Sequence, residues 1–384
     1  MLKQGLNEIP ISLVGLSHWK TPVNIRERFS LSGDSRTFLV GKARELGITS
    51  LMTLSTCNRT EIYAENASPG ELPELLHQST KGSHPDFNRY GYIKNSREAV
   101  GHLFRVAAGM DSRVSGDSRI TSQVKEALTF SIRQSAIGTR LGKLAESAIS
   151  TGKRIRNYIM PDKASPSVPQ SAADMIMEIS RQNQDRSIKY LIIGMGNIGR
   201  EIAESLLQKI PPGNITVISR NIGRLFRLYN KSGLRISPME CLEQEILGAD
   251  FVFAATSASH KVIRHDHLRN FTGHEKTIID LGVPRNVCAS VTQISGIRLI
   301  DIDQVIKGDP NVTAESMTMA EAIIDAGITE FEKWHQRWKH AQDVKYQLYE
   351  SIFDNNLDDP DQFGESKFIE GLTGNYFRYR EKVK

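Results

Sequence analysis

The sequence predicts an α/β protein with more than one domain and two different sheets. Segments 10–18 and 49–57 are short apolar runs bounded by polar residues, which is typical of strands, and a helical pattern at 35–46 separates them. From 96 to about 158, apolar residues recur every three to four positions, which predicts amphipathic helices. From 171 onward, strand patterns alternate with helix patterns, and this alternation predicts a parallel sheet.

Composition limits the class of protein. A chain of 384 residues has room for two or three domains, and 39% hydrophobic and 24% charged residues are typical of a soluble globular protein. The net charge of +5 permits an anionic partner, although a solvated surface explains it equally well. No apolar run approaches ~18 residues, and the N-terminus lacks the apolar core of a signal peptide. We therefore expect a cytoplasmic protein without a membrane span.

Prolines and strand patterns set the limits of the first domain. Segment 61–67 predicts a third strand, and the proline-containing stretch 66–91 predicts helix and loop. Residues 160–170 hold three prolines, which indicates a junction between domains. We therefore expect an N-terminal α+β domain at 1–158.

The second part of the chain carries the parallel-sheet pattern. We expect strands at 188–194, 214–220, 251–258 and 276–283. We expect helices at 171–180 and 197–210. They predict a doubly wound domain at 159–310. Helical periodicity returns at 313–350, so we expect residues 311–384 to form a C-terminal helical region.

Cys57 has the most informative surroundings of the three cysteines. It follows an apolar strand pattern and is flanked by Thr56, Asn58 and Arg59. A thiol attacks as the thiolate, which a nearby cation favours, and an arginine can also clamp a carboxylate with two parallel hydrogen bonds. The alternative is a small buried residue that ends a strand. The unpatterned cysteines predict neither a disulfide framework nor a metal site.

A glycine-rich loop predicts a dinucleotide site in the second domain. Gly194, Met195, Gly196, Asn197, Ile198 and Gly199 follow a strand pattern and open a helix pattern, which favours a Rossmann-type loop over a glycine turn without function. The next strand ends in Ser219 and Arg220, without the acidic residue that holds the ribose of NAD. These residues suit a 2′-phosphate and favour NADP(H), unless Arg220 is an ordinary surface arginine.

The remaining candidates are weaker. His102 is alone on an apolar helix pattern, where a histidine is more often part of the core than a catalyst. No pair of histidines has the spacing of a metal motif, so no metal site is expected. The strand ends at Thr256–Ser257 and Asp280–Arg285 either line the ligand crevice or simply begin loops.

Together these segments resemble the glutamyl-tRNA reductase family. Residues 15–27, GLSHWKTPVNIRE, resemble its GLSHKTAPVEIRE motif, and residues 55–63, STCNRTEIY, match its nucleophile motif without change. Residues 102–112 and 152–156 resemble its HLFRVAAGLDS and GKRVR motifs in the same order. The glycine loop and residues 280–287 resemble its cofactor-domain signatures, so the resemblance covers roughly residues 10–340.

The resemblance implies a fold and a reaction. The implied parts are a catalytic domain, a long spinal helix, a Rossmann-type NADP domain and a C-terminal helical dimerisation region. The implied reaction begins when Cys57 takes the glutamyl group from glutamyl-tRNA(Glu) as a thioester. NADPH then reduces the thioester to glutamate-1-semialdehyde, the first step of porphyrin synthesis by the five-carbon route. The resemblance also implies a homodimer and a glutamate-1-semialdehyde aminomutase as partner.

The resemblance assigns roles to single residues. Cys57 and His102 match the family's catalytic positions, and residues 194–199 match its NADP loop. The implied substrate-binding residues are Thr56, Asn58, Arg59, Ser112, Asp117, Ser118, Arg119 and Gln123. The chain departs from the family across residues 113–122, where Asp-Ser-Arg at 117–119 replaces the usual Glu-Pro-Gln, Thr121 and Ser122 replace Leu and Gly, and Arg113 replaces an apolar residue.

Two other functions are compatible with the sequence. The first alternative is a catalytically impaired relative that acts as a regulatory protein by binding tRNA, NADPH or a partner. The altered segment and a short C-terminal region are the observations behind it. A dehydrogenase similar to shikimate dehydrogenase would use only the second domain and leaves the Cys57 motif unexplained. The basic residues along the 120–156 helices either contact tRNA phosphates or form a solvated face.

Overall fold

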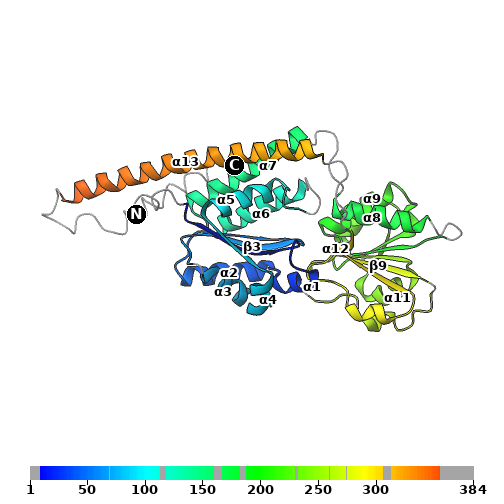
Figure 1. Cartoon of the computed structure of the whole chain (residues 1–384). Coiled ribbons are helices and arrows are strands. Elements are labelled where there is room, and N and C mark those ends of the chain that lie inside the picture. Colours follow the sequence, from blue (N-terminus) through cyan, green and yellow to red (C-terminus); the bar gives the residue numbers. More distant parts are fainter. Residues whose placement is uncertain are drawn as a thin grey trace.

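A computed structural model describes residues 9–68, 70–112, 118–159, 167–181, 187–229, 232–258, 260–273, 275–305 and 313–354 of the chain. It contains two sheets with their own helices (Figure 1). We call residues 9–159 the first unit and residues 167–305 the second unit. The predicted site residue Asp117 and the side chain of Ser118 lie outside the described part. No helix in the described residues is both long and apolar enough to cross a membrane.

The first unit is built on a four-stranded antiparallel sheet with the order β2-β3-β1-β4. Its strands are β1 (Ile11–Ser17), β2 (Leu51–Ser55), β3 (Arg59–Glu65) and β4 (Tyr92–Asn95). The prediction that 10–18 and 49–57 are strands of one sheet is confirmed. The three-residue turn between β2 and β3 contains Cys57.

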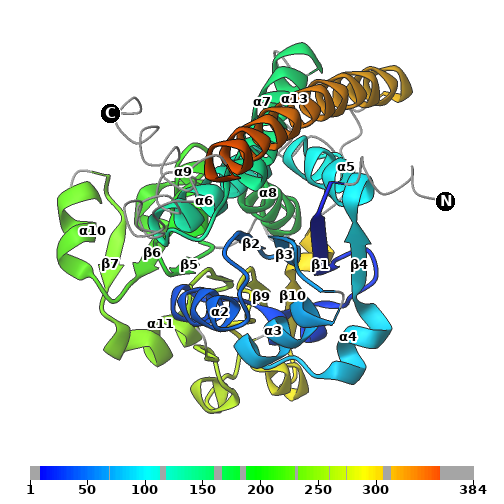
Figure 2. The same ribbon diagram turned by 90° about the vertical axis from the view of Figure 1, so that its left-hand side faces the viewer.

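Helices cover both faces of this sheet (Figure 2). One face carries α2 (Gly33–Glu45), α3 (Glu71–Ser79) and α4 (His84–Tyr90), and the other carries α5 (Ser96–Ala107), α6 (Ser118–Arg133) and α7 (Thr139–Ile159). Side chains of β1 alternate between the two cores, with Leu13 in the α5–α7 core and Val14 in the α2–α4 core.

The second unit is a six-stranded parallel sheet with the order β10-β9-β8-β5-β6-β7. The strands are β5 (Tyr190–Ile193), β6 (Ile215–Ile218), β7 (Arg235–Ser237), β8 (Phe251–Ala254), β9 (Lys276–Asp280) and β10 (Ile297–Asp301). The helices are α8 (Val168–Ser180), α9 (Asn197–Leu207), α10 (Ile222–Tyr229), α11 (Leu242–Gly248) and α12 (Ile302–Val305). The predicted parallel doubly wound sheet is confirmed. The strand order reverses between β5 and β8, the place where such sheets bind ligands.

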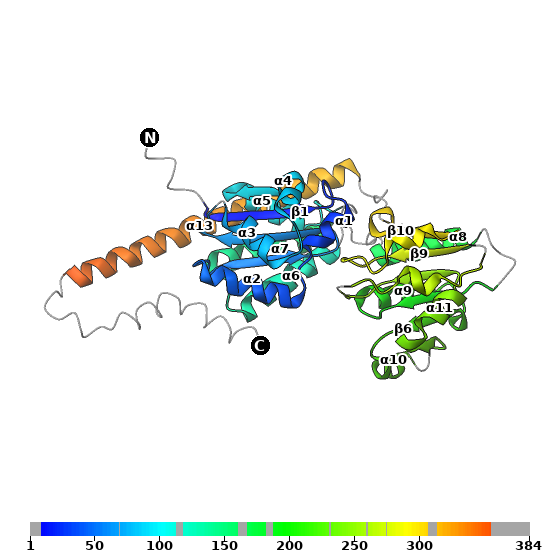
Figure 3. The ribbon, with the colours of Figure 1, turned by 90° about the horizontal axis from the view of Figure 1, so that it is seen from below.

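A short segment of the first unit lies next to the second unit. It consists of α1 (Val23–Arg26) and the 3₁₀ turn Glu27–Phe29, which follow β1. Figure 3 shows α1 at the end of the first unit that faces the parallel sheet. Val23 belongs to the apolar core of the second unit, so this segment joins the two units.

The longest helix, α13 (Ala314–Asp354), follows the second unit and returns to the first. The resemblance implies a long helix, and α13 with 41 residues is the longest helix of the described chain, against 21 residues in α7. Ile324, Ile328 and Phe331 of α13 complete the core formed by α5 and α7. From His340 to Leu348 the side chains are exposed, and this part of the helix projects beyond the sheet (Figure 1).

The contact between α13 and the first unit depends on a residue without a side chain. A Cβ at Gly327 would lie 2.5 Å from Thr151 Oγ1 of α7 and 2.8 Å from the Phe104 ring of α5. We expect Gly327→Ala to lower the free energy of unfolding by about 1–3 kcal/mol through overpacking. Gly41→Ala is the matched control, because no atom lies within 4 Å and alanine should stabilise α2 by about 0.5–1 kcal/mol. Urea unfolding midpoints test this, and equal gains in both variants would contradict the contact.

Candidate active site

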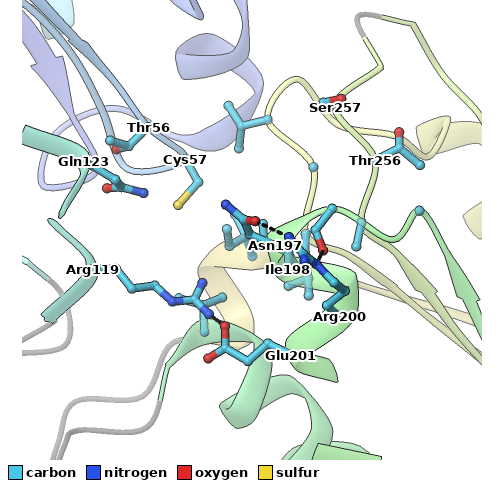
Figure 4. Close-up of a pocket in the computed structure, with 18 of the residues that line it drawn as sticks. Thr56, Cys57, Arg119, Gln123, Asn197, Ile198, Arg200, Glu201, Thr256 and Ser257 are labelled. Carbon is cyan, nitrogen blue, oxygen red and sulfur yellow. Dashed lines mark hydrogen bonds and ion pairs between the residues drawn. The ribbon is translucent and has the colours of Figure 1, made fainter. Parts of the chain in front are cut away.

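A cavity of about 660 Å³ is lined by residues of both units. It lies where the β2–β3 turn of the first unit faces the carboxyl ends of β5, β6, β8 and β9. The predicted residues that line it are Thr56, Cys57, Asn58, Arg59, Ser112, Arg119, Gln123, Gly194, Met195, Gly196, Asn197, Ile198, Ser219 and Arg220. Figure 4 shows Cys57 on one wall and Asn197 and Ile198 on the facing wall. The structure therefore brings the predicted nucleophile and the predicted cofactor loop to one cavity.

The Cys57 turn is held by its own hydroxyl group and by a neighbouring arginine. Thr56 Oγ1 accepts hydrogen bonds from the backbone N–H groups of Asn58 at 3.1 Å and Arg59 at 3.2 Å. The carbonyl oxygen of Cys57 accepts a hydrogen bond from Arg26 Nε at 3.2 Å. Cys57 is half-buried and packs against apolar residues of the second unit. Its thiol is thus presented at the boundary between the units.

Arg59 and Glu61 form a buried ion pair directly after this turn. Arg59 Nη1 donates to Glu61 Oε1 at 2.9 Å and to Asp111 Oδ2 at 2.7 Å, and both Arg59 and Glu61 are almost inaccessible. Burial by itself lowers the pKa of Arg59, but the charges of Glu61 and Asp111 outweigh it and hold that pKa above its usual range. Arg59 therefore remains a fixed positive charge at the cavity wall.

Glu61 gathers four side chains around one carboxylate. Besides Arg59, it accepts hydrogen bonds from Tyr63 at 2.7 Å, Tyr92 at 2.6 Å and His102 Nε2 at 2.8 Å. Burial raises the pKa of the Glu61 carboxyl, but the charge of Arg59 and the bond with His102 outweigh it, so that pKa lies well below its usual range. An ionised carboxylate only accepts hydrogen bonds, so His102 donates through Nε2.

His102 does not line the Cys57 cavity. It lines a second cavity of about 460 Å³ together with Trp19, Tyr92 and Asp111. The Arg59–Asp111 ion pair joins the walls of the two cavities, because Arg59 lines the first and Asp111 the second. His102 and Arg59 both bond to Glu61 Oε1, so His102 is linked to the Cys57 turn through that carboxylate. Sequence reasoning named His102 but missed Glu61, whose position inside the unchanged motif was the available signal.

Two buried polar atoms at the Cys57 turn have no hydrogen-bond partner in the described structure. They are Asn58 Oδ1 and Arg59 Nε. A buried polar atom without a partner is costly and usually has a reason. The two atoms are an acceptor and a charged donor, so a bound molecule carrying both an ammonium and a carboxylate group would satisfy them.

Each of the three glycines in the loop lacks a side chain for a different structural reason. Gly194 has a positive φ of 96°, and a Cβ there would lie 2.6 Å from the carbonyl oxygen of Ala255. A Cβ on Gly199 would overlap the carbonyl oxygen of Gly194 at 1.8 Å, so this glycine lets α9 pack on β5. A Cβ on Gly196 would meet no atom within 4 Å, although Gly196 lines the cavity at the N-terminus of α9. This open backbone fits the pyrophosphate of a dinucleotide.

The end of β6 presents a hydroxyl group and a guanidinium to the cavity. Ser219 and the exposed Arg220 line the cavity, and no acidic residue occurs in 219–229. A guanidinium in this place fits a phosphate on the ribose, whereas a ribose with a free hydroxyl would normally meet a carboxylate.

The strand ends that the sequence offered as crevice lining or loop starts form a polar network at the carboxyl ends of β8 and β9, and Thr256 and Ser257 line the cavity. The side-chain oxygen of the fully buried Asn286 accepts hydrogen bonds from Thr256 N at 2.8 Å and Thr256 Oγ1 at 3.0 Å. Asp280 accepts the backbone N–H groups of Gly282, Asn286 and Val287, each at about 3 Å. Burial nevertheless raises the pKa of Asp280 to about 6. The network fixes the loop that lines the cavity opposite the first unit.

Arg119 makes an ion pair across the cavity. Its guanidinium contacts Glu201 of α9 (Figure 4). Ser167 donates a hydrogen bond to the same carboxylate. Ser112 and Gln123 line the cavity nearby, whereas Gly199 does not. Among the described residues no group of three or more potential metal ligands occurs.

Comparisons with known proteins identify similar chains. The family model described as glutamyl-tRNAGlu reductase, N-terminal domain, matches residues 14–159, and the one described as shikimate / quinate 5-dehydrogenase matches residues 177–307. The glutamyl-tRNA reductase of Christiangramia forsetii is 30% identical over 335 residues, which cover 86% of this chain and 79% of that protein. Glutamyl-tRNA reductase 2 of Flavobacterium johnsoniae is 33% identical, covering 84% and 74%. The solved glutamyl-tRNA reductase from Methanopyrus kandleri is 23% identical with a TM-score of 0.49, covering 98% and 93%.

The charge of Glu61 should make the stability of the protein pH-dependent. Because its pKa in the folded state lies below the ordinary value near 4.5, its stabilisation is present above that value and is lost as the pH falls below it. We expect Glu61→Gln to lower the free energy of unfolding at pH 7 by about 3 kcal/mol and to flatten its decrease between pH 5 and 3.

The control for this variant is Glu45→Gln, because Glu45 forms an exposed ion pair with Lys42. Urea unfolding at pH 7, 5, 4 and 3 measures both variants. A pH profile of Glu61→Gln that runs parallel to that of the wild type would show that Glu61 is not the titrating group.

Proposed function

Because the chain belongs to the glutamyl-tRNA reductase family, we propose that it reduces glutamyl-tRNA(Glu) to glutamate-1-semialdehyde with NADPH and releases the tRNA. This would be the first step of porphyrin precursor synthesis by the five-carbon route. The observation that carries the proposal is the shared cavity, in which Cys57 and the glycine loop line opposite walls. A covalent acyl carrier and a hydride donor have to meet at one carbon atom, and this cavity provides that place.

The first step is acyl transfer to Cys57. Its sulfur attacks the ester carbonyl that joins glutamate to the tRNA, a carbon–sulfur bond forms, and the carbon–oxygen bond to the tRNA breaks. The tRNA hydroxyl takes a proton as it leaves. The hydrogen bonds of Thr56 to the turn hold the backbone on both sides of the thiol, so the nucleophile needs little rearrangement. A thioester accepts hydride more readily than the carboxylate, which is the advantage of cysteine here.

The glutamyl group is proposed to bind at the Cys57 turn. In this proposal Asn58 Oδ1 accepts a hydrogen bond from its ammonium group and Arg59 Nε donates to its carboxylate, because both atoms lack a partner and both residues line the cavity. Glu61 and Asp111 already occupy Arg59 Nη1, so Arg59 would recognise the substrate with a guanidinium whose orientation is fixed. Ser112 and Gln123 line the same cavity and complete its polar side.

The cofactor site is proposed to hold NADPH. When bound, NADPH supplies the hydride that converts the thioester into the aldehyde and frees the Cys57 thiolate. Backbone N–H groups at the start of α9 would bind the pyrophosphate beside Gly196, and Arg220 with Ser219 would bind the 2′-phosphate. Thr256, held by Asn286, lines the same cavity.

The oligomeric state and the location of the protein are part of the proposed function. We propose a homodimer in the cytoplasm that passes its aldehyde product to a glutamate-1-semialdehyde aminomutase. The exposed apolar side chains Val344, Tyr346 and Leu348 on the projecting part of α13 support self-association. An unstable aldehyde product favours direct transfer to the next enzyme.

Cys57 should carry the glutamyl group. In single-turnover reactions with labelled glutamyl-tRNA, we expect the wild type to hold label covalently without NADPH and to release semialdehyde when NADPH is added. Cys57→Ser should do neither. Cys288→Ser is the control, because Cys288 is half-buried and does not line the cavity. A wild-type protein that binds the tRNA but never forms the thioester would favour the regulatory binding protein instead.

Arg220 should select the cofactor. We expect Arg220→Gln to raise the KM for NADPH about tenfold or more, as for loss of a charge-assisted hydrogen bond, and to leave the KM for NADH unchanged. Arg227→Gln is the matched control, because Arg227 is an exposed arginine on α10 that does not line the cavity. Steady-state kinetics with both cofactors measure the effect, and equal losses with NADPH and NADH would rule out recognition of the 2′-phosphate.

A further inference from the structure

Two consecutive residues of opposite charge connect the units at α1. Arg26 is buried, and its Nη2 and Nη1 donate to Asp303 Oδ1 at 2.6 Å and Oδ2 at 3.1 Å. Asp303 belongs to α12, directly after the edge strand β10 of the second unit. Such a two-bond contact between guanidinium and carboxylate fixes direction as well as distance.

The same guanidinium binds the Cys57 turn. Arg26 Nε donates to the carbonyl oxygen of Cys57 at 3.2 Å, and Nη1 also donates to the carbonyl oxygen of Thr21 at 2.7 Å. One rigid planar group therefore links the backbone of Cys57 to a carboxylate of the other unit. Arg26 itself does not line the cavity.

Glu27, the residue after Arg26, binds the second unit with the opposite charge. Its carboxylate accepts Arg285 N and Nη2, both at 2.8 Å, and Lys261 Nζ at 3.1 Å. Lys261 also donates to the carbonyl oxygen of Arg285 at 3.0 Å. Burial raises the pKa of Glu27, but the hydrogen bonds from Arg285 and Lys261 outweigh it and the pKa lies below its usual value, so the group is ionised at neutral pH.

The partners on the second unit follow three neighbouring strands. Lys261 follows β8, Arg285 follows β9, and Asp303 follows β10. The positive Arg26 meets a negative partner and the negative Glu27 meets positive ones, so a rotation or a slip of one unit would bring like charges together. Val23, one turn earlier, adds an apolar contact with the core of the second unit.

We propose that Arg26, Glu27, Lys261, Arg285 and Asp303 form an inter-unit joint that holds Cys57 at hydride-transfer distance from the cofactor wall. The inference rests on the function proposed above and makes Arg26 and Asp303 positioning residues. The joint is needed for the reduction step and not for acylation, because acylation uses groups of the first unit alone. Reduction requires the thioester carbon on Cys57 of the first unit and the cofactor bound by the second unit to approach within about 3.5 Å, and a misplacement of about 1 Å can cost about a hundredfold in rate.

Separating the two half-reactions tests the joint. Asp303→Asn removes the charge on the second unit and leaves Arg26 its bonds to the carbonyl groups of Thr21 and Cys57. We expect its Cys57 acylation by labelled glutamyl-tRNA, measured without NADPH, to stay within about twofold of the wild type. Reduction of the preformed thioester at saturating NADPH should slow about tenfold to a hundredfold. Asp303→Glu should recover part of the reduction rate.

Arg28→Gln is the matched control. Arg28 lies two residues from Arg26 in the same segment, but its ion pair, at 3.1 Å, is with Asp86 of the first unit. Arg28→Gln should therefore keep both half-reactions at the wild-type rate. Arg285→Gln tests the joint by removing the side-chain bond of Arg285 to Glu27. It replaces Asp303→Asn in the test if that variant does not fold. Its acylation should likewise be kept and its reduction slowed.

A readout without catalysis completes the test. Hydrogen exchange of backbone amides in α1 and α12 should become faster in Asp303→Asn and stay unchanged in Arg28→Gln. The inference is overturned if the wild type performs both half-reactions and Asp303→Asn and Arg285→Gln perform both equally well. It is also overturned if their acylation falls as much as their reduction. A wild type that forms no thioester would instead refute the proposed function.

Discussion

The buried ion pair between Arg59 and Glu61 organises the first unit around the nucleophile. Arg59 begins β3 immediately after the Cys57 turn, and Glu61 lies two residues further on the same strand. Three further elements bind to this pair. Tyr92 of β4 and His102 of α5 hydrogen-bond to Glu61, and Asp111 in the turn after α5 bonds to Arg59. Removing such charges from water is costly unless every group is paired, so the network fixes one geometry rather than simply adding stability. The Cys57 turn receives its position from that geometry.

The division into two units follows from the chemistry they are proposed to share. A four-stranded antiparallel sheet can present a reactive turn at its end, whereas a parallel sheet presents a crevice at the carboxyl ends of its strands. The turn after β2 faces that crevice, and each wall of the cavity therefore comes from a different sheet. The first half of α13 returns to pack on α5 and α7, which closes the chain back onto the first unit.

Local sequence patterns predicted the parts of this arrangement that depend on local structure. The strands, the glycine loop and the residues after β6 are defined by short segments, and their periodicity or steric demands can be seen without a fold. The Glu61 network joins residues from 59 to 111, and its partners meet only through the pairing of β1 with β3 and β4. For the same reason, the separation of His102 from Cys57 and the return of α13 could not be derived from periodicity.

The altered residues at 117–119 show why a motif comparison alone is not enough. By resemblance Arg119 belongs to a glutamate-binding segment, yet its guanidinium contacts Glu201 on the cofactor helix α9. The ion pair of Arg119 with Glu201 and that of Arg26 with Asp303 both cross between the units, and they differ in exposure. The side chains of Arg26 and Asp303 are 3% and 17% exposed, whereas those of Arg119 and Glu201 are 30% and 35% exposed. Exposed pairs contribute little net free energy because water and salt screen them, so Arg119 and Glu201 add little to the alignment of the units. In the proposed joint, that alignment depends on the contacts of Arg26 and Glu27, and Arg26 also holds the backbone of Cys57.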